Sequence, residues 1–371
     1  MSEQAGSTQT PRNREIYIDV FRGLMALVMV QGHVSDTLLS PALQADSLYQ
    51  FQRIFHGSTA PGFLFASGFV AGLPRAPLSA RASLRRTRRL LFVLGVGYFL
   101  HLPYFSFWKT SGASSAAKAT LFACDALQCI AVTQLVVLAL QWLAGLRWTA
   151  AAGALAAVVL GAGPFVWSAR LAERLPPALG AYLDESTGSH FPLFPFAAFV
   201  LAGTVAGATL GRREPRARRR RAVQAGLALI GAGVLLHLAL AGRVDFWHIS
   251  PAYVLMRLGG LVLLLRLVEA ASQRGWPGIG ALALFGHETL QVFVLHLVLL
   301  FGGVIGPSAL LVWHDRLGYV ATAAVLLAML PVLYAAAWLW HRAKVAAPHE
   351  TRQALGFLSA LFLWEFFTRP W

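Results

Sequence analysis

Long apolar runs recur along this chain, and each is about as long as a membrane-spanning helix. A helix needs roughly 20 apolar residues to cross about 30 Å of hydrocarbon, and runs of that length alternate here with short polar or basic segments. The chain is 57% hydrophobic and only 13% charged, whereas soluble domains average about 25% charged residues. The sequence therefore predicts an all-α, polytopic membrane helix bundle.

Hydropathy and loop charge together predict about ten spans. They fall near residues 16–39, 49–73, 89–107, 120–144, 148–168, 193–211, 222–241, 250–268, 278–302 and 317–340. A last apolar piece, ALGFLSALFLWEFF at 354–367, is short for a span. It is interpreted as an interfacial helix or one that enters the membrane partway, so an eleventh span stays open.

Basic clusters in alternate loops predict which side of the membrane each loop faces. Lys and Arg concentrate in cytoplasmic loops, and they cluster here at 81–89, 212–221 and 341–352. The opposite loops hold the acidic residues Asp46, Glu173, Asp184, Glu185, Asp245 and Asp315. With ten spans, both termini are predicted to be cytoplasmic. Because the loops account for the net charge of +15, nucleic acid is not an expected partner.

The chain is predicted to hold one integral membrane domain at 16–340. A cytoplasmic tail at 1–15 precedes it, and a basic cytoplasmic segment with a short apolar helix follows at 341–371. No small-residue cleavage site follows the first apolar run, so that run is interpreted as a retained span. Cys124 and Cys129 lie five apart in one apolar run, which suits neither a metal site nor a disulfide, so both are assigned to packing.

The first predicted span carries ionisable residues that lipid does not tolerate. Arg22 and His33 are eleven residues apart, about three helical turns, so they share a face and lie roughly 16 Å apart along the axis. Asp19 and Asp36 extend this stripe at its two ends. The face is therefore predicted to line the bundle interior or a water-filled cavity. The alternatives are an arginine that snorkels or pairs with Asp19 as a topology residue, and a hydrogen-bonded structural histidine.

The second predicted span is interrupted near its outer end. His56 precedes the segment GSTAPG, where Pro61 and its flanking glycines should break the helix. Such a break leaves backbone groups in need of partners, which is tolerated only inside protein or beside a cavity. His56 is interpreted either as lining a site with His33 or as an interfacial histidine.

Later spans add polar residues at predicted membrane depth. Asp125 and Gln128 share a face in the outer half of the fourth span, and a carboxylate in that position commonly pairs with another group. Arg257 lies near the middle of the eighth span and needs an anion or a carboxylate partner. His296 lies in the outer half of the ninth span, whereas His190 at the lip of the sixth is interpreted as interfacial.

Two groups of residues follow from this topology. The outer group is His33, His56, Asp125 and His296. The inner group is Arg22, His287, Glu288 and the basic loop at 81–89. The sequence contains no recognisable zinc-ligand spacing, no G-x-S-x-G elbow and no P-loop, so no metal site is predicted.

Several segments resemble a known family of membrane enzymes. Arg22, ten residues and then His33 resemble the arginine–histidine signature that opens integral membrane acyltransferases of the acyltransferase-3 superfamily. RIFHGSTAPGFLFASGF and FGHETLQVFVLH are similar to a second-span motif and a late-span motif of that superfamily. CDALQCIA and FPLFPFAAFVLAG resemble blocks of the bacterial branch related to heparan-alpha-glucosaminide N-acetyltransferase. The blocks follow in the right order along most of the chain.

The resemblance implies an enzyme that takes an acyl group, usually acetyl, from cytoplasmic acyl-CoA. It would deliver this group at the outer side to a glycan or lipid-linked sugar, in the lipid of a bacterial cytoplasmic membrane. His33 matches the histidine assigned to acceptor activation, and Arg22 matches the signature arginine. Arg85 and Arg88 fall where the superfamily has basic residues near the CoA entrance. The late span departs from the pattern, with His287 for arginine, Glu288 for serine and Phe293 for tyrosine.

Acyl transfer needs a base that removes a proton from the acceptor, and histidine suits this because its pKa lies near neutrality. His33 is the predicted base, with Asp125 or Asp36 orienting its ring. The full set of catalytic candidates is His33, Asp125, His56 and His296. The substrate-binding candidates are Arg22, Asp36, Arg257, Arg85 and Arg88. Among the arginines, Arg22, Arg85, Arg86 and Arg88 are the candidates to hold the phosphates of CoA. Arg257 or the backbone of 57–62 is the candidate donor to the developing oxyanion.

Two questions stay open at this point. A secondary transporter also places Arg, Asp and His in its spans, but it commonly has inverted repeats, and none is evident here. Direct transfer and a covalent acyl-histidine route fit the sequence equally well. The identity of the acceptor, the length of the acyl group and the oligomeric state are not predicted.

Overall fold

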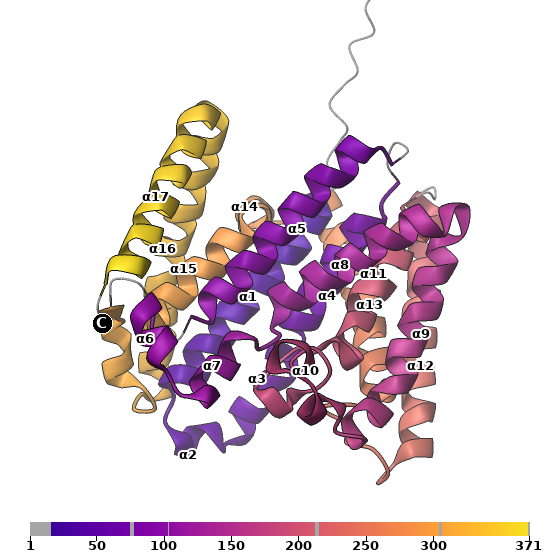
Figure 1. Cartoon of the computed structure of the whole chain (residues 1–371). Coiled ribbons are helices and arrows are strands. Elements are labelled where there is room, and N and C mark those ends of the chain that lie inside the picture. The colour runs from indigo at the N-terminus through magenta and orange to yellow at the C-terminus, as the bar shows by residue number, and fades with distance from the viewer. Residues whose placement is uncertain (1–15, 75–77, 103, 212–214, 304–305, 370–371) are drawn as a thin grey trace, which may run out of the picture.

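The computed structural model describes residues 16–74, 78–102, 104–211, 215–303 and 306–369. These residues are almost entirely helical, and the helices pack side by side into a bundle (Figure 1). Within the described ranges, β structure is limited to the two-residue strands β1 (Gly302–Gly303) and β2 (Gly306–Pro307), which pair antiparallel, and to one isolated bridge between Leu39 and Leu317. The predicted all-α fold is confirmed.

The helices follow one another along the whole chain with short connections. The first are α1 (Ile16–Leu38), α2 (Pro41–Gln44), α3 (Ser47–His56), α4 (Thr59–Gly72), α5 (Ala80–Leu100), α6 (Phe107–Gly112), α7 (Ser115–Leu121), α8 (Ala126–Leu143) and α9 (Trp148–Ser168). The rest are α10 (Pro177–Gly180), α11 (Leu193–Leu210), α12 (Pro215–Leu240), α13 (Pro251–Gln273), α14 (Ile279–His287), α15 (Thr289–Phe301), α16 (Tyr319–Ala346) and α17 (Pro348–Thr368). Short 3₁₀ turns lie at Gly145–Arg147, Leu171–Arg174, Glu185–Thr187 and Ala309–Trp313.

Several of these helices can cross a membrane by length and composition alone. Among the described residues, five qualify singly, and they are Ala126–Leu143, Gly145–Ser168, Leu193–Leu210, Arg216–Leu240 and Tyr319–Ala346. The pair α14 and α15 qualifies as a sixth, bent by 85° between its two helices. The protein is therefore an integral membrane helix bundle. The count of ten spans stays a prediction, because helices such as α1 and α13 carry charged residues along their length.

Helix α1 lies inside the bundle, with apolar neighbours on two sides. Its first half, including Phe21 and Met25, belongs to a buried cluster with residues of α4, α11 and α13. Its second half, including Val30 and Val34, belongs to another cluster with residues of α15 and α16. A helix enclosed in this way must turn its polar side chains toward other protein groups or a cavity.

The C-terminal segment forms a longer helix than the apolar run predicts. Helix α17 has 21 residues, about 31 Å at the usual rise per residue. Its end lies against α6, where the Ser106 hydroxyl donates to the Arg369 carbonyl at 2.8 Å and the Trp108 indole N–H to the Phe367 carbonyl at 2.9 Å. Because α6 belongs to the connection between α5 and α8, on the predicted outer side, this contact favours an eleventh span over an interfacial helix.

Two glycines allow α1 and α14 to approach each other closely. A Cβ atom at Gly23 would overlap the Leu282 carbonyl, and one at Gly286 would overlap the Asp19 backbone. Such backbone contact requires the absence of a side chain, as in other small-residue helix interfaces. This contact holds α1 against the helix that leads into α15.

Gly286→Ala is expected to lower the stability of the protein by about 1–3 kcal/mol, because the added methyl group forces α1 and α14 apart. Gly280→Ala is the matched control, since a Cβ at Gly280 on the same helix meets nothing within 4 Å. Thermal unfolding of the two purified variants compares them directly. Equal midpoints would show that the close contact does not matter.

Candidate active site

A histidine pair joins α1 to α15 at the centre of the bundle. His33 Nδ1 lies 2.8 Å from His296 Nε2, and the two rings are stacked with centroids 5.1 Å apart. His296 is completely buried and His33 is half-buried. Both residues were candidates from the sequence, and the fold brings them together across 263 positions of the chain.

The hydrogen bonds of this pair fix which ring nitrogens carry protons. His296 Nδ1 lies 3.1 Å from the Val292 carbonyl oxygen, and a carbonyl only accepts, so Nδ1 carries the hydrogen. In a neutral His296, Nε2 then accepts from His33 Nδ1–H. A neutral imidazole carries a hydrogen on only one of its nitrogens, so His33, with its hydrogen on Nδ1, has none on Nε2. Thus a chain from Val292 through His296 selects the tautomer in which His33 Nε2 is basic.

Asp36 and His56 form a second pair next to His33. His56 Nδ1 lies 3.3 Å from an Asp36 carboxylate oxygen, and the Tyr49 hydroxyl donates to the other oxygen at 2.6 Å. The His56 ring meets the His33 ring edge to face, with centroids 5.5 Å apart. Asp36 therefore orients His56, and among the described residues the partner that orients His33 directly is His296.

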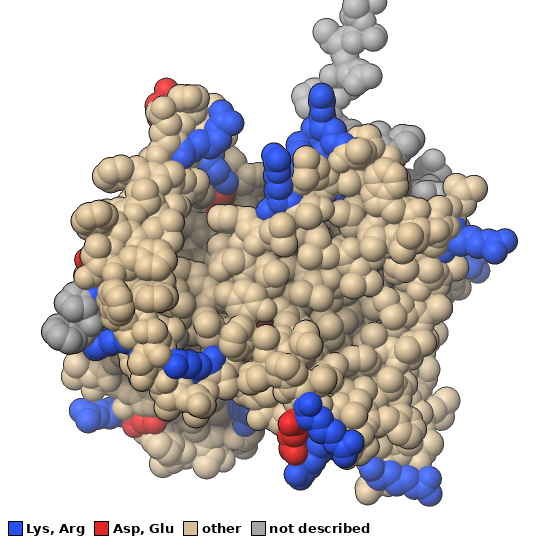
Figure 2. Space-filling model, in the orientation of Figure 1, with Lys and Arg blue, Asp and Glu red and all other residues tan. Residues whose placement is uncertain are grey.

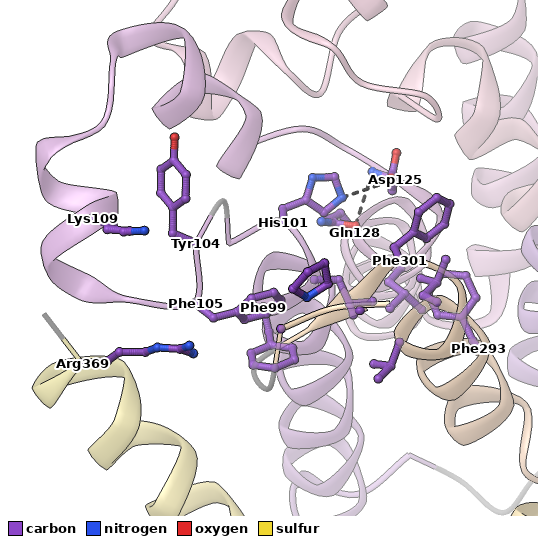
Figure 3. Close-up of a pocket in the computed structure, with 18 residues that line it drawn as sticks. Phe99, His101, Tyr104, Phe105, Lys109, Asp125, Gln128, Phe293, Phe301 and Arg369 are labelled. Carbon is purple, nitrogen blue, oxygen red and sulfur yellow. Dashed lines mark hydrogen bonds and ion pairs between the residues drawn. The ribbon is translucent and has the colours of Figure 1, made fainter. Parts of the chain in front are cut away.

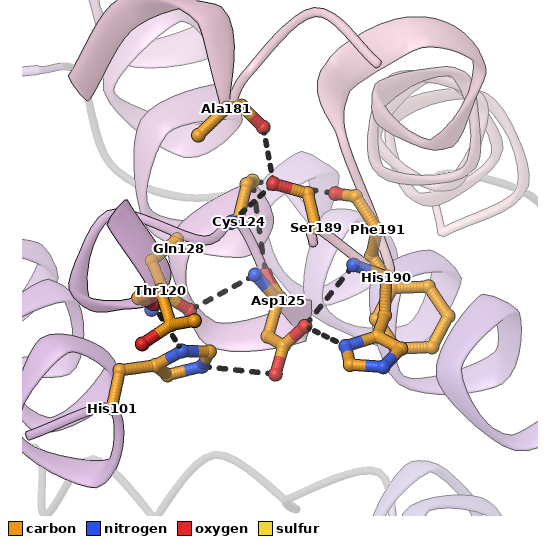
Figure 4. A network of polar contacts seen from close by, with 9 residues as sticks. All are labelled: His101, Thr120, Cys124, Asp125, Gln128, Ala181, Ser189, His190 and Phe191. Carbon is orange, nitrogen blue, oxygen red and sulfur yellow. Dashed lines mark hydrogen bonds and ion pairs between the residues drawn. The ribbon is translucent and has the colours of Figure 1, made fainter. Parts of the chain in front are cut away.

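Asp125 is the centre of a separate polar network at the start of α8 (Figure 4). Its carboxylate lies 3.0 Å from His101 Nε2 and 2.9 Å from His190 Nδ1. His101 Nδ1 lies 3.1 Å from the Thr120 carbonyl. Since both nitrogens of His101 face acceptors, both carry hydrogens and the ring is an imidazolium. Asp125 thus pairs with a cationic histidine rather than binding His33.

The partners of Asp125 were not identified by sequence reasoning. His101 was not singled out, and His190 was interpreted as interfacial. They lie 24 and 65 positions from Asp125, so no local spacing marks them. The hydrogen bond to the Asp125 carboxylate raises the pKa of His190 above its ordinary value. Asp125 and His190 are also near enough to His33 to interact with it electrostatically, so the networks share one region.

A cavity of about 620 Å³ opens beside the Asp125 network. Figure 3 shows His101, Asp125 and Gln128 toward one end of it, with Lys109 and Arg369 at the opposite end. Aromatic rings make up much of the wall, and they are Phe99, Tyr104, Phe105, Phe293 and Phe301. We refer to this space as the outer cavity, because its walls come from the ends of α5 and α15 that are predicted to be outside.

A second cavity of about 350 Å³ lies at the other end of the same helices. Arg22, Arg86 and Arg89 line it, together with apolar residues of α4, α5 and α8. Lys and Arg side chains also gather around a hollow at this end of the molecule (Figure 2). We refer to this space as the inner cavity. It is basic at its rim and apolar within, which suits a ligand with phosphates and a less polar arm.

The two cavities adjoin each other. Leu127 of α8 and Phe293 of α15 line both of them. The Phe293 ring also contacts the His296 ring, with centroids 5.6 Å apart. The common wall of the two cavities therefore lies directly beside the histidine pair, although neither cavity has His33 among its described lining residues.

The arginines predicted to bind substrate have different surroundings. Arg22 lines the inner cavity and lies 3.5 Å from the Asp19 carboxylate. Arg85 and Arg88 are exposed on α5 and are not among the described residues that line either cavity. Their neighbours Arg86 and Arg89 line the inner cavity instead.

Arg257 joins the two halves of the broken second span. Its guanidinium donates to the Ile54 carbonyl at 2.6 Å and to the Ser58 hydroxyl, and it lies over the Tyr253 ring. The helix break occurs at residues 57–58, between α3 and α4, where it was expected. Arg257 therefore satisfies an unpaired backbone group of the break, as helix ends in a membrane require.

Three possible metal ligands meet where α14 bends into α15. His287, Glu288 and His341 have ligand atoms within 4.8 Å of one another. The buried Glu288 carboxylate is also bound by the Lys344 ammonium at 2.5 Å and by His341 at 2.9 Å. The Lys344 ammonium on this carboxylate would compete with a metal ion. We therefore interpret the cluster as an ion pair that links the start of α15 to α16. The sequence did not reveal it, because His341 belongs to a distant helix.

The chain was also compared with known proteins. The model of the family described as heparan-alpha-glucosaminide N-acetyltransferase, catalytic, matches residues 14–240, more than half of the chain. The matched part contains His33, His56, Asp125 and the inner-cavity arginines, whereas His296 lies beyond it. No curated protein matches the sequence.

Proposed function

The chain belongs to the family of the heparan-alpha-glucosaminide N-acetyltransferase catalytic domain, and from this premise we propose that it moves an acetyl group from acetyl-CoA to a sugar acceptor across the membrane. Acetyl-CoA would enter at the basic end, and the acceptor would enter at the opposite end. One observation carries the proposal: the inner and outer cavities occupy opposite ends of α5, α8 and α15 and adjoin beside His33 and His296.

The inner cavity suits the donor. Arginine binds phosphate through paired donors of fixed geometry, so Arg86, Arg89 and Arg22 are fitted to hold the phosphates of CoA. The apolar wall deeper in, which includes Phe63 and Leu127, would accept the pantetheine arm. The thioester then reaches the common wall of the two cavities.

The histidine pair supplies the base. As the acceptor oxygen or nitrogen attacks the thioester carbonyl, its proton passes to His33 Nε2, and collapse of the intermediate breaks the C–S bond. The leaving thiolate then takes a proton, which His33 can return. In the neutral pair, the hydrogen bond from His33 Nδ1 to His296 leaves His33 Nε2 free to take the proton. Family membership favours this enzyme over the transporter alternative.

Arg86→Gln and Arg89→Gln are each expected to raise the dissociation constant of acetyl-CoA about tenfold, since a hydrogen bond to a charged group contributes roughly 1.5–3 kcal/mol. Arg85→Gln and Arg88→Gln are the matched controls, because these neighbours on α5 carry the same charge but line neither cavity within the described chain. Equilibrium binding of acetyl-CoA to the purified variants measures the difference. An equal loss of acetyl-CoA affinity in all four variants would show that the effect comes from overall charge and not from contact with the ligand.

The activity itself is tested with purified protein, acetyl-labelled radioactive acetyl-CoA and an extract of cell-envelope glycans. We expect label to pass to a glycan with release of one CoA thiol for each acetyl group transferred. The proposed function would be refuted by a protein that shows a cooperative thermal unfolding transition, and is therefore folded, yet neither binds acetyl-CoA nor transfers label.

A further inference from the structure

The outer cavity contains a buried hydrogen-bond donor that has no partner in the described part of the chain. Gln128 is 0% exposed and lines this cavity. Its Oε1 atom accepts from the Asp125 backbone N–H at 3.3 Å, which fixes the orientation of the amide. Its Nε2 atom has no hydrogen-bond partner among the described residues. An unsatisfied buried donor costs roughly 1–3 kcal/mol, so the site is completed by something that accepts.

The amide of Gln128 is held in place by a glycine on the facing helix. A Cβ atom at Gly97 of α5 would lie 2.7 Å from Gln128 Cδ and 3.0 Å from Nε2. Because Gly97 has no side chain, the amide fits between α5 and α8 with little room to rotate. The donor is therefore fixed in position before any ligand arrives.

The surroundings of Gln128 define what the ligand can be. An amide NH₂ only donates, so the ligand atom that meets it is an oxygen acceptor and not an ammonium group. The neighbouring Asp125 carboxylate accepts hydrogen bonds from hydroxyl groups, and the Phe99 and Phe105 rings offer flat apolar surface to C–H faces. Oxygen acceptors, hydroxyl donors and apolar C–H faces occur together in a sugar ring.

We propose that Gln128 Nε2 donates to one hydroxyl oxygen of the acceptor sugar when that sugar occupies the outer cavity, which makes this cavity a subsite with a defined contact. The subsite rests on the proposed function, since it assigns the acceptor to this end of the protein. Gln128 binds and orients the sugar, whereas the attacking group is the one directed to His33. The sugar hydroxyl that faces Gln128 is therefore not replaceable by an ammonium group, which only donates.

The probe for this subsite is methyl glucoside together with its four monodeoxy analogues, titrated by saturation-transfer NMR into the purified full chain. Wild type is expected to bind one of the analogues about fivefold more weakly than the parent sugar, the usual worth of one neutral hydrogen bond. Gln128→Leu is expected to bind the parent sugar about fivefold more weakly than wild type does. Within this variant, the affinities for the parent sugar and for that analogue should be equal. This pattern identifies the contact atom by atom.

Thr133→Val is the matched control, because Thr133 is buried on the same helix and lines neither cavity. It is expected to bind all the sugars as wild type does. Unchanged affinity of Gln128→Leu for acetyl-CoA shows that the variant is folded.

Two results would overturn the subsite. One is that wild type binds acetyl-CoA and transfers label but does not bind the glucosides. The other is that Gln128→Leu discriminates among the analogues as wild type does. Failure of the proposed function looks different, since the wild-type chain would then bind no acetyl-CoA.

Discussion

Replacing His33 by alanine is expected to lower acetyl transfer by about 10²–10⁴-fold, the usual contribution of a positioned general base. The affinity for acetyl-CoA should not change, because His33 is not among the described residues that line the inner cavity. Initial rates of label transfer at saturating acetyl-CoA measure the effect. His248→Ala is the control, since His248 is exposed and pairs with Asp245 away from the site.

A His33→Ala protein that binds acetyl-CoA and transfers acetyl at the wild-type rate would contradict the assignment of the base. The same preparation of wild type separates direct transfer from a covalent route. Rapid denaturation at neutral pH before acceptor is added should trap label on His33 only if an acyl-histidine forms, because an acyl-imidazole hydrolyses quickly in acid.

Substitutions of His296 are expected to separate its hydrogen-bonding role from its packing role. In Gln, the amide oxygen can occupy the position of Nε2 and accept from His33 Nδ1–H, whereas Asn is too short to reach. His296→Gln should therefore retain most of the transfer rate. His296→Asn should lose about 10²-fold, because a small misplacement of a catalytic group has an effect of that size.

The pH profile distinguishes this positioning role from a general loss of structure. With Asn at 296, His33 Nδ1 loses its acceptor and the ring is free to adopt the other tautomer, so both the rate and the pH at half-maximal rate should change. Equal rates and equal profiles in the two variants would show that His296 only fills space.

The periodicity of the first span was sufficient to predict how Arg22 and His33 are placed along their helix. Helical spacing placed Arg22 and His33 on one enclosed face, and the loop charges assigned them to opposite ends of α1. The structure places Arg22 at the inner cavity and His33 beside the cavity wall. Spacing gives relative positions on a single helix, which is why this part could be predicted.

The partners of these residues could not be predicted, because they depend on packing between distant segments. Arg85 with Arg88 and Arg86 with Arg89 each have the same i, i+3 spacing, so the sequence does not say which pair faces the cavity. In the structure, the second pair lines the inner cavity. Arg257 was expected to pair with an anion, but its partners are a carbonyl and a hydroxyl exposed by the break between α3 and α4.

The C-terminal helix shows a different limit of hydropathy. Its first turns contain the polar segment PHETRQ, which hides the start of the helix from an apolar scan. Pro348 at the first helical position is a common start, since its missing N–H needs no partner there. The proline therefore marks the start of this helix better than hydropathy does.

Membrane vesicles of known sidedness test the central claim most directly, because acetyl-CoA does not cross a bilayer. In inside-out vesicles the basic loops face the medium, so labelled acetyl-CoA added outside should label glycans enclosed within. In sealed right-side-out vesicles the same addition should give no label. Equal labelling in both orientations, or labelling only in right-side-out vesicles, would contradict transfer from the basic end of this protein to the opposite side.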